Sequence, residues 1–289
     1  MAGRGLTGKG PSTAVMVGVY GVALAVGAAV ALAMPDAALW WRLLAADLAA
    51  TAVVWLAGVA VDNTSIYDSY WSVAPLPLAL ATWVDGGGTR ALLASVCLAL
   101  WGARLTWNFW RGWSGLGHED WRYDAYRRFG VAPYWALSLV GLMTMPTLMV
   151  FGAMLPVIQG SGSTAPVGLI DALAVVVALG FLGVETLADE QLRAYRKTKP
   201  EPGHFLKTGL WAWSRHPNYL GEIGFWWGIG LFGVAAGVPW TLVGAAGITL
   251  LFVTISVPLI DARMNRRRAT YADHCRRIPA IFPLWYGRG

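Results

Sequence analysis

The sequence predicts an all-α fold, a polytopic bundle of seven to eight transmembrane helices with eight preferred. Three observations predict it. Hydrophobic residues make up 56% of the chain and charged residues only 13%, about half the charged fraction usual in soluble proteins. Apolar runs recur at roughly 17–25 residues, the length that crosses a bilayer as a helix. Lysine and arginine collect in alternate loops, as they do on the cytoplasmic side of membrane proteins.

Short polar or turn-forming segments separate the apolar runs. Pro35-Asp36, Asp62-Asn63-Thr64 and Gly237-Val238-Pro239 are breaks of this kind. Eight spans are preferred to seven because seven would separate the basic tail from the other basic loops. The predicted spans are 13–34, 43–61, 66–84, 89–110, 133–158, 166–190, 218–236 and 239–262.

The basic residues predict the orientation of these spans. With eight spans, 19 of the 22 Lys and Arg residues fall on one side, while Arg42 and Arg90 fall on the other and Arg104 lies inside a span. The positive-inside rule then places both termini in the cytoplasm. We expect a multi-pass protein of the inner (plasma) membrane. The first span exceeds the roughly 7–15 residues of a signal-peptide core, so we expect no cleavage.

The composition also predicts a single integral domain over residues 1–289. No hydrophilic stretch reaches the roughly 50 residues of an independent domain. Cys97 and Cys275 lie in different surroundings, and the four histidines are scattered, so we expect no disulfide and no metal site. No glycine-rich phosphate loop is present. We expect membrane lipids and a lipophilic small molecule as partners, with no nucleic acid and no obligate protein partner.

Ionisable residues inside spans usually face a cavity or a partner. Glu185, Asp189 and Arg193 follow one another at intervals of four, so they share a helix face, which Arg196 extends. Two further polar stripes are Asn218 with Glu222, and Arg104 with Asn108 and Arg111. Each stripe alone is explained as well by helix-end residues that bond one another. The three together favour a pocket for a polar ligand, open to the cytoplasm.

The segment 209–222 reads GLWAWSRHPNYLGE and places Arg215, His216, Asn218 and Tyr219 around Pro217, which can begin a helix. A helix N-terminus beside arginine and histidine favours an anion. The tail adds further arginines, for which membrane orientation and anionic lipid binding are the simpler explanation. Its apolar end, residues 278–285, predicts a docked rather than a free tail. These tail arginines are Arg263, Arg266, Arg267, Arg268, Arg276 and Arg277.

Six short motifs follow one another along the chain: Asn63 to Trp71, Trp101-Gly102-Ala103-Arg104-Leu105, Glu119-Asp120-Trp121-Arg122-Tyr123, Glu185 to Leu192, Gly209 to Glu222, and Phe282-Pro283-Leu284-Trp285. In this order and spacing they resemble the DUF1295 family of bacterial membrane proteins, which is similar to steroid 5α-reductases (3-oxo-5α-steroid 4-dehydrogenases). The resemblance covers residues 63–289, a reductase-like core with its basic tail 263–289, and leaves 1–62 as N-terminal spans.

The resemblance implies an NADPH-dependent oxidoreductase of lipid or steroid metabolism, which transfers hydride to the β-carbon of a lipophilic enone. In these reductases an acidic residue and a tyrosine bind the substrate carbonyl. Asp68 stands at the acidic position, and Tyr70 is chosen as the tyrosine, with Tyr67 in reserve. Glu185 replaces an asparagine of the reductases, and Arg263 stands near one of their histidines.

The cofactor shell maps most directly onto Asp189, Arg196, Asn218 and Glu222. All candidate cofactor-binding residues together are Arg104, Asn108, Arg122, Glu185, Asp189, Arg193, Arg196, Arg215, His216, Asn218, Tyr219, Glu222, Arg263 and Arg267.

This chemistry is physically consistent. Hydride transfer leaves negative charge on the enone oxygen, and a preorganised donor there is worth several kcal/mol in the transition state. Asp68 can donate only when protonated, a form that burial favours. The cofactor supplies the hydride, and the protein supplies position and field. A purely structural role for Asp68, paired with Ser72 or Arg104, is the alternative.

Two other functions remain open. Isoprenylcysteine carboxyl methyltransferases, which bind S-adenosylmethionine, share an RHPxYxG signature and a basic tail. They carry a Glu-Glu pair after the last span, where this chain has Asp261-Ala262-Arg263-Met264-Asn265. A transporter or lipid-binding scaffold is the third candidate, although transporters tend to show internal repeats and none is visible here. Steroid, isoprenoid enone and fatty enal substrates are all compatible with an apolar bundle.

Overall fold

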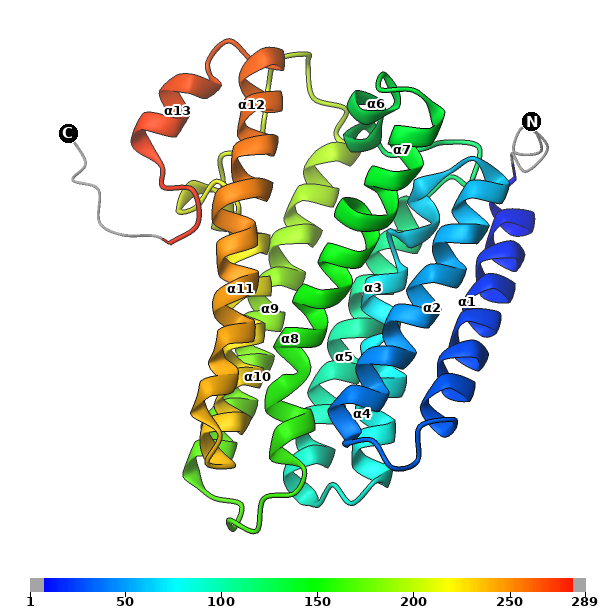
Figure 1. Cartoon of the computed structure of the whole chain (residues 1–289). Helices are drawn as coiled ribbons and strands as arrows, with labels where there is room; N and C mark the ends of the chain where they lie inside the picture. Colours follow the sequence, from blue (N-terminus) through cyan, green and yellow to red (C-terminus); the bar gives the residue numbers. More distant parts are fainter. Residues whose placement is uncertain (1–7, 283–289) are drawn as a thin grey trace. The chain divides into compact units, whose positions relative to one another are not determined.

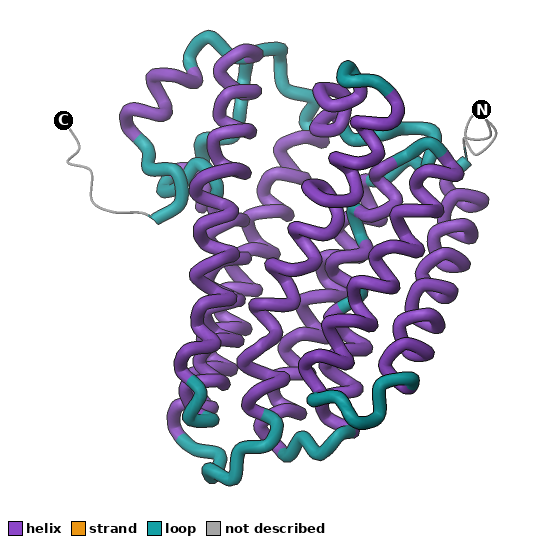
Figure 2. Tube along the Cα trace, in the orientation of Figure 1, coloured by secondary structure: helices purple, strands orange, loops and turns teal. Residues whose placement is uncertain are grey.

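The computed structural model describes residues 8–282, and within that range it contains helices and loops but no strand (Figure 1, Figure 2). The predicted all-α class is thereby confirmed for the described part of the chain. Two compact units divide the chain, residues 1–164 and residues 165–289. This division falls inside the segment 63–289, whereas residues 1–62 belong to the same unit as residues 63–164.

The first unit packs a helical hairpin against one long helix, α5, and several shorter ones. The two arms of the hairpin, α1 and α2, lie side by side (Figure 1). A buried apolar cluster that includes Met16, Val54, Ile66 and Tyr70 fills its centre. The helices of this unit are α1 (Lys9–Leu32), α2 (Leu39–Val61), the 3-10 helix η2 (Thr64–Tyr67), α3 (Tyr70–Val73), α4 (Pro75–Val84), α5 (Thr89–Gly112), α6 (Trp121–Arg127), α7 (Val131–Leu137), a π-helical segment (Ser138–Thr144) and α8 (Met145–Gly160).

The second unit is built on two long helices, α9 and α10, which pack closely along their length. A third long helix follows as α11, a π-helical segment and α12 without a break in the ribbon (Figure 2). The helices of this unit are α9 (Leu169–Lys197), the 3-10 helix η4 (Gly209–Ala212), α10 (Pro217–Ala235), the 3-10 helix η5 (Pro239–Leu242), α11 (Val243–Leu251), the π-helical segment (Phe252–Ser256), α12 (Val257–Arg267) and α13 (Tyr271–Arg277).

Within residues 8–282, six helical stretches are long and apolar enough to cross a membrane. A multi-pass membrane protein is therefore supported, while the eighth span and the sidedness of the termini stay predictions. The six are Lys9–Leu32, Leu39–Val61, Thr89–Gly112, Val131–Gly160, Leu169–Lys197 and Pro239–Arg267.

The two remaining predicted spans differ from these six for physical reasons. The run 66–84 divides into η2, α3 and α4, and Pro75 and Pro77 at the start of α4 lack the N–H groups that would continue the helical ladder from α3. The run 218–236 is one helix, α10, but its glycines and Glu222 lower its apolar content. Most of the α10 side chains are buried against neighbouring parts of the protein rather than presented to lipid.

The tail is docked, as its apolar end predicts, over the part that the structure describes. The backbone N–H groups of Arg215 and His216 donate to the carbonyls of Pro279 and Ala280, both over 3.0 Å. Ile281 is buried against Ile223 and Val257. Pro283, Leu284 and Trp285, which belong to the same prediction, lie outside the described residues, as does Arg4.

Candidate functional site

The predicted site residues fall in both units, and each unit holds a polar cluster that can be described by itself. The first unit contains Asp68, Tyr70, Arg104, Asn108 and Arg122. The second unit contains Glu185, Asp189, Arg193, Arg196, Arg215, His216, Asn218, Tyr219, Glu222, Arg263 and Arg267.

The first cluster is built on the turn that ends α2. Asp62 takes the left-handed conformation, with φ at 52°, that commonly ends a helix. The Asn63 side chain accepts from the Ser65 N–H at 2.8 Å, which starts the 3-10 helix η2. The Asn63 amide also donates to the carbonyls of Leu116 and His118, at 2.7 and 3.2 Å. Asn63 thereby fixes the loop after α5 onto this turn.

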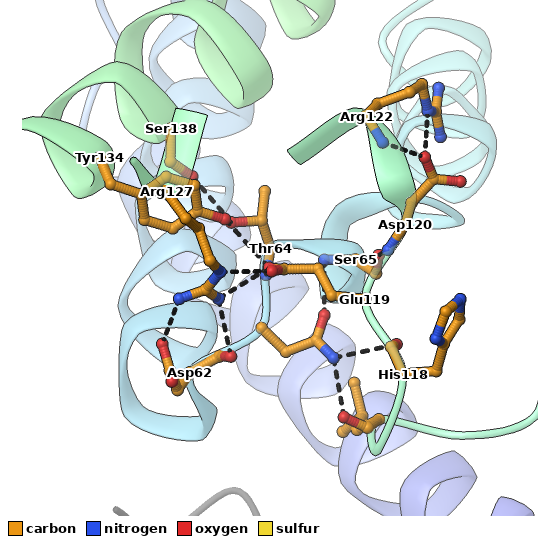
Figure 3. Close-up of polar contacts among 12 residues, drawn as sticks. Asp62, Thr64, Ser65, His118, Glu119, Asp120, Arg122, Arg127, Tyr134 and Ser138 are labelled. Atoms are coloured by element: carbon orange, nitrogen blue, oxygen red, sulfur yellow. Dashed lines mark hydrogen bonds and ion pairs between the residues drawn. The ribbon is translucent and has the colours of Figure 1, made fainter. Parts of the chain in front are cut away.

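Glu119 ties that loop to the turn from the other side, as Figure 3 shows. Its carboxylate accepts from the Thr64 N–H at 2.6 Å and from the Arg127 Nε at 2.5 Å. Arg127 also donates to the Asp62 carboxylate at 2.8 Å, and its guanidinium stacks on the Tyr134 ring. The hydrogen bonds to Glu119 raise the pKa of Arg127 further above its usual value.

This loop places α6 over Asp68. Asp120 caps the helix by accepting from the Arg122 N–H at 2.9 Å. The Tyr123 hydroxyl then donates to Asp68 Oδ1 at 2.5 Å, and the Arg122 guanidinium lies 3.4 Å from the same oxygen. Burial, and then the charge of Asp68, raise the pKa of Tyr123 well above its usual value. Tyr123 therefore keeps its proton and acts as a hydrogen-bond donor.

The tyrosine that contacts Asp68 is thus Tyr123, rather than the chosen Tyr70 or the reserve Tyr67. Tyr67 is buried and its hydroxyl bonds to that of Thr147 at 2.8 Å. The Tyr70 hydroxyl is buried too, with no hydrogen bond to any described residue. Among residues 8–282, neither Ser72 nor Arg104 is a partner of Asp68, so the structural pairing considered for it does not occur there.

The second cluster depends on the close approach of α9 and α10. Gly221, Gly224 and Gly228 form one face of α10, and a Cβ atom at each would lie within 2.8 Å of atoms of Glu185, Phe181 and Ala178 respectively. The pairs run in opposite directions along the two helices, which are therefore antiparallel. Small residues at such a seam let two membrane helices approach at backbone distance.

One turn beyond this seam, the polar side chains of the two helices meet. The Asn218 amide donates to Asp189 Oδ1 at 3.3 Å. Glu185 and Glu222 are 4% and 3% exposed, and Glu222 accepts from the Trp226 indole N–H at 2.8 Å. The stripes predicted on the two helices therefore lie against each other; Glu185 and Glu222 are buried within the protein, and Asp189 is half-buried.

Arginines gather where α9 ends. Arg196 is exposed, and it lies within electrostatic reach of Arg193, Arg268 and Asp189. Arg263 and Arg267 are carried by α12. A like-charged group of this kind is a suitable environment for an anionic ligand.

Arg215 and His216 have a partner in the protein that the sequence did not indicate. His216 Nε2 and the Tyr271 hydroxyl lie 2.9 and 2.6 Å from Asp261 Oδ1, and Arg215 lies 3.2 Å from Asp261 Oδ2. The His216 ring also stacks on Tyr219, which packs against Phe252. These contacts hold the start of α10 against α12 and α13. Burial, with the bond to Asp261, raises the pKa of Tyr271.

Sequence reasoning missed the roles of Glu119, Tyr123 and Arg127 in the first unit. A signal was present for two of them, because Glu119 to Tyr123 is one of the motifs that carry the resemblance. No role followed from that motif alone, because its residues contact segments more than fifty positions away in the chain.

Comparison with known proteins gives one family and two relatives. The family described as "Protein of unknown function (DUF1295)" matches residues 54–278. An uncharacterized protein of Schizosaccharomyces pombe is 28% identical over 263 residues, which cover 80% of this chain and 76% of that protein. The protein-S-isoprenylcysteine O-methyltransferase of Saccharomyces cerevisiae is 63% identical over 35 residues, which cover 12% of this chain and 14% of that enzyme. No solved structure matches the chain.

Proposed function

Because this chain belongs to the DUF1295 family, whose description assigns no activity, we propose a function from the site itself: a membrane-embedded, NADPH-dependent reductase that reduces the carbon–carbon double bond of a lipophilic enone, as steroid 5α-reductases do. The proposal has two separable parts. Nucleotide binding is assigned to the cluster in the second unit. Contact with the substrate carbonyl is assigned to Asp68 and Tyr123 in the first unit.

The arginine group at the end of α9 is the observation that carries the nucleotide assignment. Arg193, Arg268 and Asp189 each lie within electrostatic reach of Arg196. NADPH carries a diphosphate and a further phosphate, and arginine is the side chain best suited to bind phosphate oxygens in pairs. S-adenosylmethionine carries no phosphate for these arginines to bind.

The rest of the donor set also suits a nucleotide. Asn218 and Asp189 present an amide and a carboxylate side by side, and both hydroxyl and carboxamide groups can bond to such a pair. Glu185 and Glu222 add buried acceptors on the same two helices. Bound NADPH would supply the hydride, while these side chains bind and orient it.

Asp68 and Tyr123 are suited to holding a carbonyl oxygen. The 2.5 Å contact between the Tyr123 hydroxyl and Asp68 Oδ1 can be made with the proton on either residue. We expect a protonated Asp68 to donate to the Tyr123 oxygen when substrate binds, which leaves the Tyr123 proton for the carbonyl. A donor of this kind, held in place by Asp68, stabilises the negative charge that develops on an enone oxygen as its β-carbon is reduced. Tyr123 therefore takes the role that the resemblance implied for Tyr70.

A methyltransferase acting on isoprenylated cysteine is the second candidate, and one specific observation favours it. The 35-residue match to the yeast isoprenylcysteine methyltransferase is far closer than the 28% identity to the S. pombe protein. It covers only 14% of that enzyme, so it supports a shared element rather than a shared activity. Both candidates require a cofactor, but the two cofactors differ in charge.

Ligand-dependent thermal stability of the purified protein separates the two candidates. We expect NADPH to raise the unfolding midpoint in a concentration-dependent way, since a ligand at 100 times its Kd stabilises the folded state by about 2.7 kcal/mol. Arg196→Gln should weaken NADPH binding about tenfold or more, as expected for a lost charged hydrogen bond. Asn218→Ala and Glu222→Ala should also weaken it while the protein still inserts.

Arg128→Gln is the matched control, because it removes an exposed arginine of the first unit and should leave the NADPH response unchanged. If only S-adenosylmethionine raised the unfolding midpoint, the reductase proposal would be wrong and the methyltransferase would be the better assignment. Equal stabilisation by NADH would keep the reductase but remove any role for the additional phosphate of NADPH.

We further propose that the chain crosses the inner membrane eight times, with both termini and the nucleotide site in the cytoplasm. The segments α3–α4 and α10 would add two crossings to the six apolar stretches. The distribution of basic residues supports this arrangement. A lipid-soluble substrate would then be available from the surrounding bilayer.

A further inference from the structure

A cavity of about 500 Å³ lies in the second unit, between the end of the membrane helix α11–α12 and the docked tail. This volume is in the usual range for small-molecule sites. Its walls come from the π-helical segment, α12, α13 and the tail. They comprise Arg215, Val253, Val257, Cys275, Arg276, Arg277, Ile278, Pro279, Ala280, Ile281 and Phe282.

The lining is divided between apolar and basic groups. Val253 and Val257 lie four residues apart on the membrane-spanning stretch Pro239–Arg267, so they share a face, and Val253 is 46% exposed. This wall therefore belongs to a helix surface of the kind that contacts acyl chains. Three arginines and no carboxylate complete the lining. The cavity is thus apolar along a membrane helix and positive at one end.

The three arginine side chains differ in whether an acidic side chain pairs with them. Arg215 pairs with Asp261, and Arg276 pairs with Asp273. Among residues 8–282, the side chain of Arg277 makes no ion pair or hydrogen bond, and it is exposed. A positive charge therefore remains at the cavity for a ligand to neutralise.

From this division of charge and apolar surface, we propose that the cavity binds an anionic phospholipid of the surrounding membrane, with its phosphate at Arg276 and Arg277 and the start of an acyl chain against Val253 and Val257. Basic pockets beside membrane helices bind anionic headgroups by the same combination of forces. The site is independent of the proposed reductase activity. By joining α12 to the tail that holds Arg215 and His216, a bound lipid would stabilise the start of α10.

Cys275 offers a direct readout, because it lines the cavity while Cys97, the other cysteine, is 2% exposed. The full-length protein is placed in nanodiscs of phosphatidylcholine, with or without phosphatidylglycerol, and the rate of maleimide labelling at Cys275 is followed. We expect phosphatidylglycerol to slow labelling several-fold. Arg276→Gln combined with Arg277→Gln should abolish this protection, and Arg128→Gln should retain it.

An anionic bilayer slows thiolate reactions generally by lowering the surface pH, so a second thiol measures that effect. Ala272→Cys, in a Cys275→Ser background, places an exposed thiol on the same helix outside the cavity. Equal slowing at residues 272 and 275 would overturn the proposal. So would equal labelling of Cys275 in both bilayers, protection by inorganic phosphate alone, or protection by NADPH without phosphatidylglycerol.

Discussion

The proposed contact with the substrate carbonyl depends on Asp68, and the neighbours of Asp68 determine which hydrogen bonds it can make. Its Oδ1 accepts a 2.5 Å hydrogen bond from Tyr123 and lies 3.4 Å from the Arg122 guanidinium. In this contact Asp68 accepts from Tyr123. A protonated Asp68, the form that burial favours, can instead donate to the Tyr123 oxygen and leave the Tyr123 proton for the substrate.

Tyr123→Phe tests this assignment, because it removes the hydroxyl and keeps the ring. With a lipophilic enone that supports NADPH oxidation by the native protein, we expect turnover to fall about 100-fold or more, as when one oxyanion donor is lost. NADPH-dependent stabilisation should be unchanged. Asp68→Asn should likewise slow turnover strongly with nucleotide binding intact.

Tyr126→Phe is the matched control on the same helix, because the Tyr126 hydroxyl does not contact Asp68. Its turnover should equal that of the native protein. A fully active Tyr123→Phe variant would remove this tyrosine from the reaction, and a fully active Asp68→Asn variant would remove Asp68.

Among the secondary-structure elements, the α9–α10 pair determines the geometry of the proposed nucleotide cluster. Ala178, Phe181, Glu185 and Asp189 on α9 oppose Gly228, Gly224, Gly221 and Asn218 on α10 in an antiparallel register. Because the backbones touch along the glycine face, the polar turn that follows has little freedom to separate. Packing of small residues thus brings the acids and the amide together.

Gly228→Ala should disrupt this seam. The added Cβ would lie 2.5 Å from the backbone N of Ala178 and 2.6 Å from its Cα, and backbone atoms cannot move aside as a flexible side chain can. We expect destabilisation of about 1–3 kcal/mol, the usual range for overpacking, measured as a lower thermal midpoint in detergent.

Gly180→Ala and Gly183→Ala on α9 are matched controls, because no atom lies within 4 Å of the added Cβ. Alanine forms helix better than glycine by about 1 kcal/mol, so these variants should be as stable as the native protein or more stable. A Gly228→Ala variant with an unchanged midpoint would mean that the two helices are not in backbone contact there.

In the whole molecule, the number of membrane crossings determines which loops lie on the same side of the membrane. The eight-span proposal places the loops at Asp85 and Thr164 outside the cell and those at Glu201 and Ala272 inside, and all four residues are exposed. Single cysteines at these positions, in a Cys275→Ser background, should follow this division when intact cells are labelled with an impermeant maleimide.

We expect Asp85→Cys and Thr164→Cys to be labelled in intact cells, and Glu201→Cys and Ala272→Cys only after permeabilisation. Labelling of Asp85→Cys only after permeabilisation would show that α3–α4 does not cross. The six apolar stretches would then need a different connection through the membrane.

The sequence by itself determined the features that depend on local composition. The length of apolar runs identified seven of the eight predicted spans as continuous helices, because a helix in a membrane must be apolar over a fixed length. The spacing of Glu185 and Asp189, and that of Asn218 and Glu222, predicted that each pair shares a helix face. This prediction is possible because the helical repeat depends only on positions close together in the sequence. The apolar end of the tail likewise predicted docking, which holds for residues 278–282.

The tertiary structure alone decided which partners these residues meet. Tyr123 reaches Asp68 across 55 positions of the chain, through a loop that Asn63 and Glu119 fix in place, and no periodic pattern encodes such a contact. The same holds for Asp261, which binds His216 across 45 positions. Contacts of this kind depend on how separate elements pack, and so does the cavity that the tail closes against α12.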